Sequence, residues 1–146
     1  MKIRDTTSDD HAAWLHLWQG FLAFHDTDLA PAITAHTWAR LIDPANPMQM
    51  RLAEGDGRVV GFAIHQHHPS TWVLGDDCYL EDLYVEPDQR GKGIGRALME
   101  DLQQLAKSKG WNRLYWHSDG DNVAARRLYD SFTLADGFIR YRFALK

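Results

Sequence analysis

Hydrophobic side chains recur along this chain with two periods, and the two kinds of segment alternate. Helical spacing marks the stretch from residues 7–10 to about His25, then residues 34–41, 94–109 and 122–132. Strand-like runs cover residues 2–4, 50–54, 58–66, 78–85, 113–117 and 138–145. The order βααβββαβαβ predicts a single α/β domain over residues 1–146, with a mixed central sheet flanked by helices.

Turn and capping residues separate these runs where the pattern requires them. The segment Gly55-Asp56-Gly57 predicts a hairpin between two of the strands. Lys109-Gly110 predicts the end of the third helix, because cations and glycine are favoured at helix C-termini.

The segment between the strand at 78–85 and the third helix carries the main chemical signal. It holds Gly91, Gly93 and Gly95 at alternate positions, and its cations are Arg90, Lys92 and Arg96. Amide groups at a helix start have no intrahelical partner and lie at the positive end of the helix dipole. We therefore expect an anion site suited to a diphosphate, rather than a flexible loop without a ligand. The spacing fits neither the dinucleotide fingerprint nor the P-loop.

Composition narrows the class of protein. A net charge of −4 argues against nucleic acid as a partner, because phosphate binding requires a basic face. The single cysteine, Cys78, excludes an internal disulfide framework and suits a reducing compartment. The N-terminus lacks the apolar run of a signal peptide, and no segment is long and apolar enough to span a membrane. These observations predict a soluble cytoplasmic protein.

Two sequence blocks in the predicted order resemble the GNAT superfamily of acetyl-CoA-dependent N-acetyltransferases. The first is the glycine segment, and the second is Asn122-Val123-Ala124-Ala125-Arg126-Arg127-Leu128-Tyr129, which is similar to the N-x-x-A-x-x-L-Y helix of that family. The run at 79–85 resembles small amine and polyamine acetyltransferases, and the ending at 137–142 is similar to the fungal histone/polyamine acetyltransferase type. One departure is the longer connection Asp130–Asp136 before Gly137-Phe138, which bears on the wall of the active site.

The resemblance implies which residues bind acetyl-CoA. These are Leu83, Tyr84, Val85, Arg90, Gly91, Lys92, Gly93, Ile94, Gly95, Arg96, Asn122 and Ala125. Backbone groups of the strand would pair with the pantetheine arm where the strand splays from its neighbour, and an amide near Leu83 would polarise the thioester. Core packing of Leu83 and Val85 is compatible with this role. Asn122 would bind pantetheine, cap its helix, or do both.

The resemblance also implies the residue that donates a proton, and the chemistry of the amine indicates the residue that accepts one. Tyr129 would act as the general acid that protonates the departing sulfur, the alternative being a core tyrosine. Glu81 is the candidate base, directly or through water, because an alkylammonium with a pKa of about 10.4 must lose a proton before it attacks. The alternative for Glu81 is a buried ion pair with an arginine of the last strand. Regular strand alternation places Glu81 and Asp82 on opposite faces.

The predicted acceptor site consists of Glu81, Asp82, Tyr115, Trp116 and His117. Acidic side chains there, with His25, Asp26 and Asp28 after the first helix, would concentrate a cationic ligand. We expect no metal, because His65, His67 and His68 lack the other ligands of a site. Cys78 has no basic partner that would make it a nucleophile.

We therefore expect an N-acetyltransferase that moves acetyl directly to a primary amine of a small molecule in a ternary complex. The acceptor would be a polyamine, an amino acid or a related amine, and the chain could form a homodimer. The alternatives are a protein lysine acetyltransferase of histone type and a module that senses acetyl-CoA without turnover.

Overall fold

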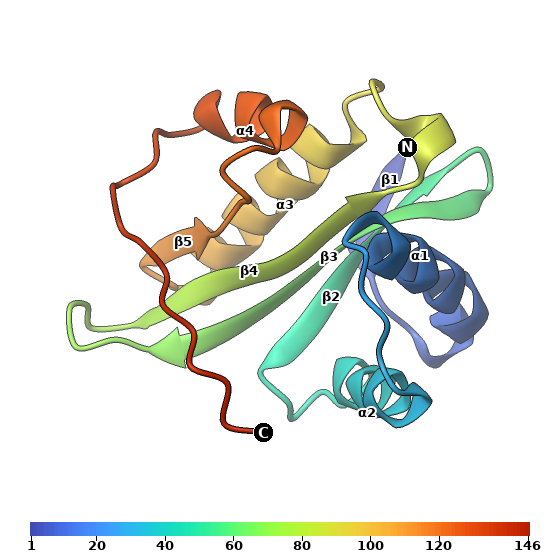
Figure 1. Ribbon diagram of the computed structural model, residues 1–146, viewed down its shortest axis with the longest axis horizontal. Coiled ribbons are helices and arrows are strands. Elements are labelled where there is room, and N and C mark those ends of the chain that lie inside the picture. The colour runs from blue at the N-terminus through green and yellow to red at the C-terminus, as the bar shows by residue number, and fades with distance from the viewer.

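The protein, described over residues 1–146 by a computed structural model, is a five-stranded sheet with helices on both faces (Figure 1). The strands are β1 (Lys2–Asp5), β2 (Met48–Gly55), β3 (Arg58–Pro69), β4 (Asp76–Val85) and β5 (Arg113–Trp116), in that spatial order. The helices are α1 (His11–Phe24), α2 (Pro31–Leu41), α3 (Ile94–Lys109) and α4 (Val123–Asp130), and short 3-10 turns cover Ser8–Asp10 and Pro87–Gln89. Every neighbouring pair is antiparallel except β4–β5, so the predicted mixed sheet is confirmed.

Each face of the sheet has its own hydrophobic core. On one face, Trp14 and Leu17 of α1 pack against Leu52, Phe62 and other apolar strand residues, with α2 at the edge. On the other face, the apolar stripe of α3 packs against Cys78, Leu80 and their neighbours. A third of the way along the chain, the β2–β3 hairpin turns at Asp56 and Gly57 with φ of 53° and 76°, which is the left-handed pair of a two-residue turn, as predicted.

Strands β4 and β5 separate beyond their first few residues. Their parallel pairing runs from Asp77–Arg113 to Leu80–Trp116 and then stops. The remaining part of β4, residues 81–85, therefore has no strand beside it on that side, as the resemblance implied. We call this opening the β4–β5 gap.

The predicted last strand at 138–145 is wrong for the single chain. Residues 134–146 make no backbone–backbone hydrogen bond, and they cross the open side of the sheet as an extended tail (Figure 1). An alternating pattern becomes a strand only when a sheet edge lies alongside it. Here Gly137, with φ of 85°, and the Phe138 amide, which donates to the Asp136 carboxylate at 3.1 Å, turn the chain away from β5.

Candidate active site

A row of unpaired amide groups lies between β4 and α3. The amides of Gly91, Lys92 and Gly93 donate no hydrogen bond within the protein. Gly91 and Gly93 have φ of 77° and 82°, which favours glycine at both positions. The first bond of α3 runs from the Ala97 amide to the Gly93 carbonyl at 3.0 Å, so the amides of 94–96 also precede the helical ladder. Six successive donors at a helix start suit a diphosphate.

The cations near this row are held by protein contacts. Arg90 donates from Nε to the Val85 carbonyl at 2.9 Å, and its guanidinium lies 5.4 Å from the Phe24 ring centroid and 5.3 Å from that of Tyr84. Arg90 therefore orders the loop that carries the amides. Lys92 donates to the Gln89 side chain at 3.3 Å and Arg96 to the Ser131 hydroxyl at 2.7 Å, contacts that a bound anion could replace.

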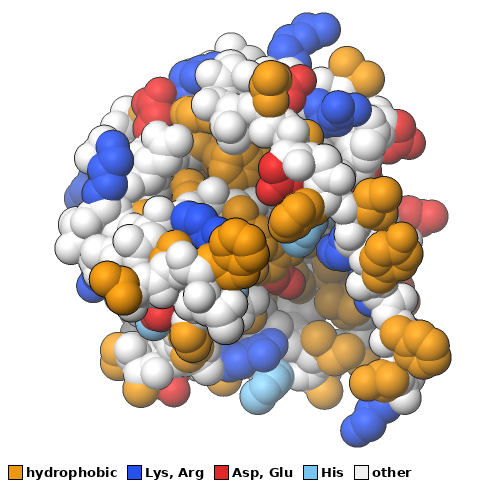
Figure 2. Space-filling view, turned by 90° about the vertical axis from the view of Figure 1, so that its left-hand side faces the viewer, with side chains coloured by type: hydrophobic (Ala, Val, Ile, Leu, Met, Phe, Trp, Pro, Cys, Tyr) orange, Lys and Arg blue, Asp and Glu red, His pale blue; other side chains and the backbone are white.

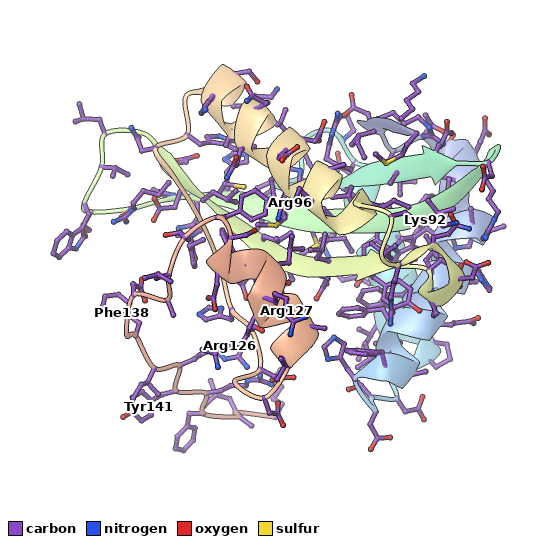
Figure 3. The ribbon with its side chains drawn as sticks, turned by 90° about the horizontal axis from the view of Figure 1, so that it is seen from above. Lys92, Arg96, Arg126, Arg127, Phe138 and Tyr141 are labelled. Carbon is purple, nitrogen blue, oxygen red and sulfur yellow. The ribbon has the colours of Figure 1, made fainter.

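Helix α4 adds two cations that the predicted cofactor set left out. Arg126 and Arg127 line a surface pocket with Val123 and Asp130. Figure 3 shows them projecting from α4, whereas Lys92 and Arg96 come from the loop and first turn of α3. Both arginines lie inside the N-x-x-A-x-x-L-Y block, so their place in that block was the available signal.

Backbone groups of β4 open into the β4–β5 gap. The Glu86 amide donates to the Val60 carbonyl of β3 at 2.8 Å. Because the polar groups of successive strand residues point to alternate sides, those of Leu83 and Val85 point into the gap. The Arg90 bond to the Val85 carbonyl agrees with this assignment. The side chains of Leu83 and Val85 pack against the core on the α3 face, so packing and an available backbone coexist.

A β-bulge interrupts β4 at Glu81. Asp82 is paired with Ile64 and Leu80 with His65, so Glu81 is an extra residue without a partner on β3. Asp82 shares the face of Ile64, which packs under α1, and Glu81 accepts a long hydrogen bond of 3.4 Å from Gln66 on that same face. The prediction that these carboxylates face opposite sides is therefore wrong, because the bulge cancels one step of the alternation.

The surroundings of Asp82 favour its protonated form. Burial, and then the charge of Glu81, raise the pKa of Asp82 to about 7. Glu81 is exposed and forms no salt bridge, so the alternative of a buried ion pair with a last-strand arginine is excluded. Asp82 therefore exchanges its proton near neutral pH.

The remaining predicted acceptor residues divide between the two faces of the sheet. The Tyr79 hydroxyl lies 3.1 Å from His117 Nδ1, and the Tyr79 ring lies 4.9 Å from that of Tyr115. Tyr115 and His117 therefore share the face of Glu81 and Asp82. Trp116 packs on the α3 face, 5.5 Å from the Tyr129 ring, so it is not part of the same surface. A four-residue strand places consecutive side chains on opposite sides.

Tyr129 lies across the sheet from Glu81. Its ring packs against the core on the α3 face, and burial raises the pKa of its hydroxyl above the usual value, so it keeps its proton at neutral pH. Asn122 caps α4 by accepting a hydrogen bond from the Ala125 amide at 3.2 Å. That bond occupies the Ala125 amide and leaves the amino group of Asn122 available.

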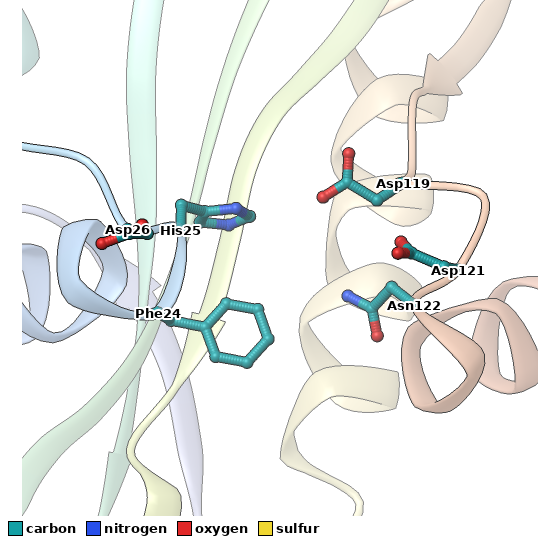
Figure 4. Close-up of a pocket in the computed structure, with 6 residues that line it drawn as sticks. All are labelled: Phe24, His25, Asp26, Asp119, Asp121 and Asn122. Atoms are coloured by element: carbon teal, nitrogen blue, oxygen red, sulfur yellow. The ribbon is translucent and has the colours of Figure 1, made fainter.

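A pocket joins the end of α1 to the loop before α4 (Figure 4). It is lined by Phe24, His25, Asp26, Asp119, Asp121 and Asn122. The structure thus brings the predicted His25 and Asp26 opposite Asp119 and Asp121, two carboxylates that the sequence analysis did not single out. Asp28 does not line this pocket.

The histidines of β3 and Cys78 are held in the fold by packing and hydrogen bonds and do not form a reactive group. His65 is buried without a hydrogen-bond partner, and His67 stacks on Trp111 and bonds to Asp76 at 2.7 Å. No three metal-ligating side chains are grouped together. Cys78 is buried, and this burial raises its pKa to about 12, so it has little thiolate character. None of the helices is both long enough and apolar enough to cross a membrane.

Comparisons with known proteins agree with this geometry. Residues 11–133 match the acetyltransferase (GNAT) family. The chain is 33% identical over 135 residues to D-amino-acid N-acetyltransferase HPA3 of Saccharomyces cerevisiae, covering 91% of this chain and 84% of that protein. It is 32% identical over 90 residues to thialysine N-epsilon-acetyltransferase of Mus musculus, covering 58% of this chain and 52% of that one.

Solved structures share the fold. A ribosomal-protein-alanine N-acetyltransferase from Brucella melitensis superposes with a TM-score of 0.82 at 22% identity, covering 99% of this chain and 100% of that one. A probable acetyltransferase reaches a TM-score of 0.88 at 20% identity over 100% and 99% of the two chains. The family match and the yeast relative, together with the glycine loop and the open β4 strand, show that this chain is an N-acetyltransferase of the GNAT family.

Proposed function

We propose that this enzyme transfers the acetyl group of acetyl-CoA to a primary amine of a small molecule, by direct attack in a ternary complex. The acceptor class is a polyamine, an amino acid or a related amine. One observation carries the proposal: the bulge at Glu81 sets two carboxylates beside the gap into which the backbone of Leu83 opens. Proton acceptors and a carbonyl-polarising amide are thereby adjacent on one strand.

The residues present fit acetyl-CoA. The unpaired amides of 91–96 would hold its diphosphate, with Lys92 and Arg96 as cations that can turn to it. The gap-facing backbone of Leu83 and Val85 would pair with the pantetheine amides as an added strand does. When bound, acetyl-CoA supplies an acetyl thioester as the acyl donor.

The side chains of the site would manage two protons. Glu81, aided by Asp82, would accept a proton from the alkylammonium so that the nitrogen can attack. Tyr129, protonated at neutral pH and on the other side of the gap, would give a proton to the departing thiolate. The amide of Leu83 would stabilise the negative charge that develops on the carbonyl oxygen.

The pocket in Figure 4 supports a cationic acceptor. Three carboxylates, Asp26, Asp119 and Asp121, line it and would attract an ammonium group. The relatives named for D-amino acids and thialysine act, by those names, on small amines, which favours the same class here. A protein lysine is the alternative acceptor. A non-catalytic sensor of acetyl-CoA would not need the carboxylates at the bulge or the half-buried Tyr129.

We also propose that the enzyme works in the cytoplasm and as a homodimer. The absence of a helix that could cross a membrane and the single buried cysteine are compatible with the first proposal. The exposed apolar side chains of residues 138–145 favour the second, and Figure 2 shows exposed hydrophobic side chains along one edge of the molecule.

Two measurements test the proposed function. Calorimetry should detect acetyl-CoA binding, and a panel of polyamines, D- and L-amino acids and a lysine peptide should give transfer to small amines. Glu81→Gln should lower kcat by about 10²-fold without weakening acetyl-CoA binding. Glu100→Gln on the exposed face of α3 is the matched control and should have no effect. Absence of acetyl-CoA binding would refute the whole proposal, whereas transfer only to the peptide would refute the small-molecule acceptor.

A further inference from the structure

Phe24 forms part of the wall of the pocket in Figure 4, which we call the acceptor pocket after the role proposed for it. It is the last residue of α1, and its side chain packs in neither hydrophobic core. The ring is 56% exposed, and the neighbouring His25 ring lies edge-on to it with 5.2 Å between the centroids. Core packing therefore does not hold this part of the wall in place.

The backbone beside Phe24 is fixed by the turn that ends α1. The Thr27 amide donates to the Leu22 carbonyl at 2.9 Å, and Asp26 has a left-handed φ of 48°, which is uncommon outside glycine. These features fix the Cα of Phe24 and leave its side-chain torsions to be chosen among the staggered rotamers. The orientation of the ring is therefore set by the groups that contact it.

Arg90, at the start of the glycine loop, contacts this ring from outside the pocket. The carbon at the centre of its guanidinium lies 5.4 Å from the Phe24 ring centroid and 5.3 Å from the Tyr84 ring centroid, so one cation stacks on two aromatic rings. Its Nε donates to the Val85 carbonyl at 2.9 Å. Arg90 has no carboxylate partner, so the two rings and one carbonyl hold its side chain.

Tyr84 is the fixed member of this stack. It is only 6% exposed, belongs to the first core and lies 5.9 Å from the Phe62 ring. Gly20 of α1 admits the Tyr84 hydroxyl, because a Cβ at Gly20 would lie 2.4 Å from that oxygen. Since Tyr84 is held by the core and Phe24 is not, the position of Arg90 is imposed from the core and passed outward to Phe24.

We infer that Arg90 positions Phe24 in the wall of the acceptor pocket, so that a residue of the glycine loop sets the affinity for the amine. Arg90 does not line the pocket itself, so its effect passes through the Phe24 ring. An alkylammonium attracted by the carboxylates of the pocket also needs an apolar surface for its carbon chain, and the Phe24 ring supplies one. The inference rests on the acceptor site of the proposed function.

The role is compatible with a bound pantetheine arm. A backbone carbonyl has two lone pairs, so the Val85 carbonyl that accepts from Arg90 can accept a second hydrogen bond from a pantetheine amide. Arg90 therefore keeps its place beside Phe24 when the gap-facing backbone of β4 is in use.

Four variants and one control isolate the contact. Arg90→Ala removes the cation, Phe24→Ala removes the ring, and the double variant removes both. Arg90→Lys keeps a cation that can stack on Phe24 but loses the planar fork. The matched control is Arg58→Ala, because Arg58 is an exposed arginine that bonds to Asp88 at 3.0 Å beside the same loop and stacks on no ring.

The measurements do not depend on turnover. The probe amine is 1,4-diaminobutane, and NMR titration of the Asp26 and Asp119 amides gives its dissociation constant. The resonance of the Arg90 Nε–H reports the stack directly, because the ring currents of Phe24 and Tyr84 displace it. Calorimetry on the same samples measures acetyl-CoA binding. A protein that fails to bind acetyl-CoA would refute acetyl transfer and would leave the readouts of Arg90 and Phe24 intact, so the two proposals can fail separately.

Arg90→Ala and Phe24→Ala should each weaken amine binding by about two- to tenfold. The double variant should bind no more weakly than Phe24→Ala alone, because the two residues act in series. Arg90→Lys should bind the amine more tightly than Arg90→Ala, Phe24→Ala should shift the Arg90 Nε–H resonance, and Arg58→Ala should change neither quantity. Three results would overturn the inference: additive losses in the double variant, an Arg90 resonance that Phe24→Ala leaves in place, or pocket amides of the natural protein that do not respond to the amine.

Discussion

Glu81 and Asp82 are consecutive in the chain and lie on the same face of β4. The bulge at Glu81 produces this pairing, and the resulting proximity of two carboxylates contributes to the raised pKa of Asp82, after burial. Like charges held together are unfavourable for folding, and they are useful where an amine must lose a proton. Under the proposed function, the pair would reduce the stability of the fold and assist deprotonation of the amine.

Replacing Asp82 should separate its effect on folding stability from its effect on activity. An aspartate whose native pKa is about 7, against about 3.9 when unfolded, loses stability as pH rises between those values, because the unfolded state releases its proton first. Asp82→Asn should therefore be more stable than the natural protein at pH 8, by up to about 4 kcal/mol, and less active. Urea unfolding at pH 4 and pH 8 measures this. An equal difference at both pH values would show that Asp82 does not titrate as described.

Removal of the Tyr129 hydroxyl should affect chemistry and leave binding intact. Phenylalanine keeps the ring that packs beside Trp116, so the core is preserved. We expect Tyr129→Phe to lower kcat by about 10²-fold with the affinity for acetyl-CoA unchanged. Single-turnover rates and calorimetry on the same preparation check both statements. An unaltered rate would eliminate Tyr129 as the general acid.

The conformation of the glycine loop should affect the affinity for acetyl-CoA more than the free energy of unfolding. Gly93 has φ of 82° and open space where a Cβ would lie, so Gly93→Ala introduces backbone strain on the order of 1–2 kcal/mol without a clash. We expect the loop to relax, its amide row to lose alignment, and acetyl-CoA binding to weaken at least about tenfold.

Gly57 supplies a matched control for that experiment. It has φ of 76°, also has open space around it, and lies in the β2–β3 turn outside the glycine loop. Gly57→Ala should lower the free energy of unfolding by a similar amount and leave acetyl-CoA affinity unchanged. Equal losses of affinity in the two variants would show that general destabilisation, not loop geometry, controls binding.

The buried His65 should make the protein sensitive to mild acid. Burial lowers its pKa to about 4, whereas the unfolded value is about 6.5. Between these values the unfolded state binds the extra proton, so stability should fall by up to about 3 kcal/mol as pH drops from 6.5 to 4. His65→Gln lacks this contribution, and the gap in unfolding free energy between variant and natural protein should narrow over the same range. If the unfolding free energies of the two proteins changed in parallel with pH, the lowered pKa of His65 would be contradicted.

The sequence alone determined those features that depend on neighbours along the chain. The helices, the first five strands, the Asp56-Gly57 turn, the Gly110 helix end and the glycine loop are set by local backbone preferences, and they lie close to where the pattern predicted; the run at 138–145 is the exception. The family resemblance could also be recognised from the sequence, because each of its two blocks is a continuous stretch of the chain.

Tertiary structure decided the features that need a partner strand distant in sequence. Glu81 is an extra residue only because its neighbours on β4 pair with consecutive residues of β3. The β4–β5 gap forms because β5 stops pairing with β4 after Trp116. Packing of the sheet against α3 likewise decided which face of β5 carries Trp116 and which carries Tyr115. The tail shows the same limit: its alternation specifies a strand, but strand formation requires an edge alongside, and the single chain does not bring the tail to one.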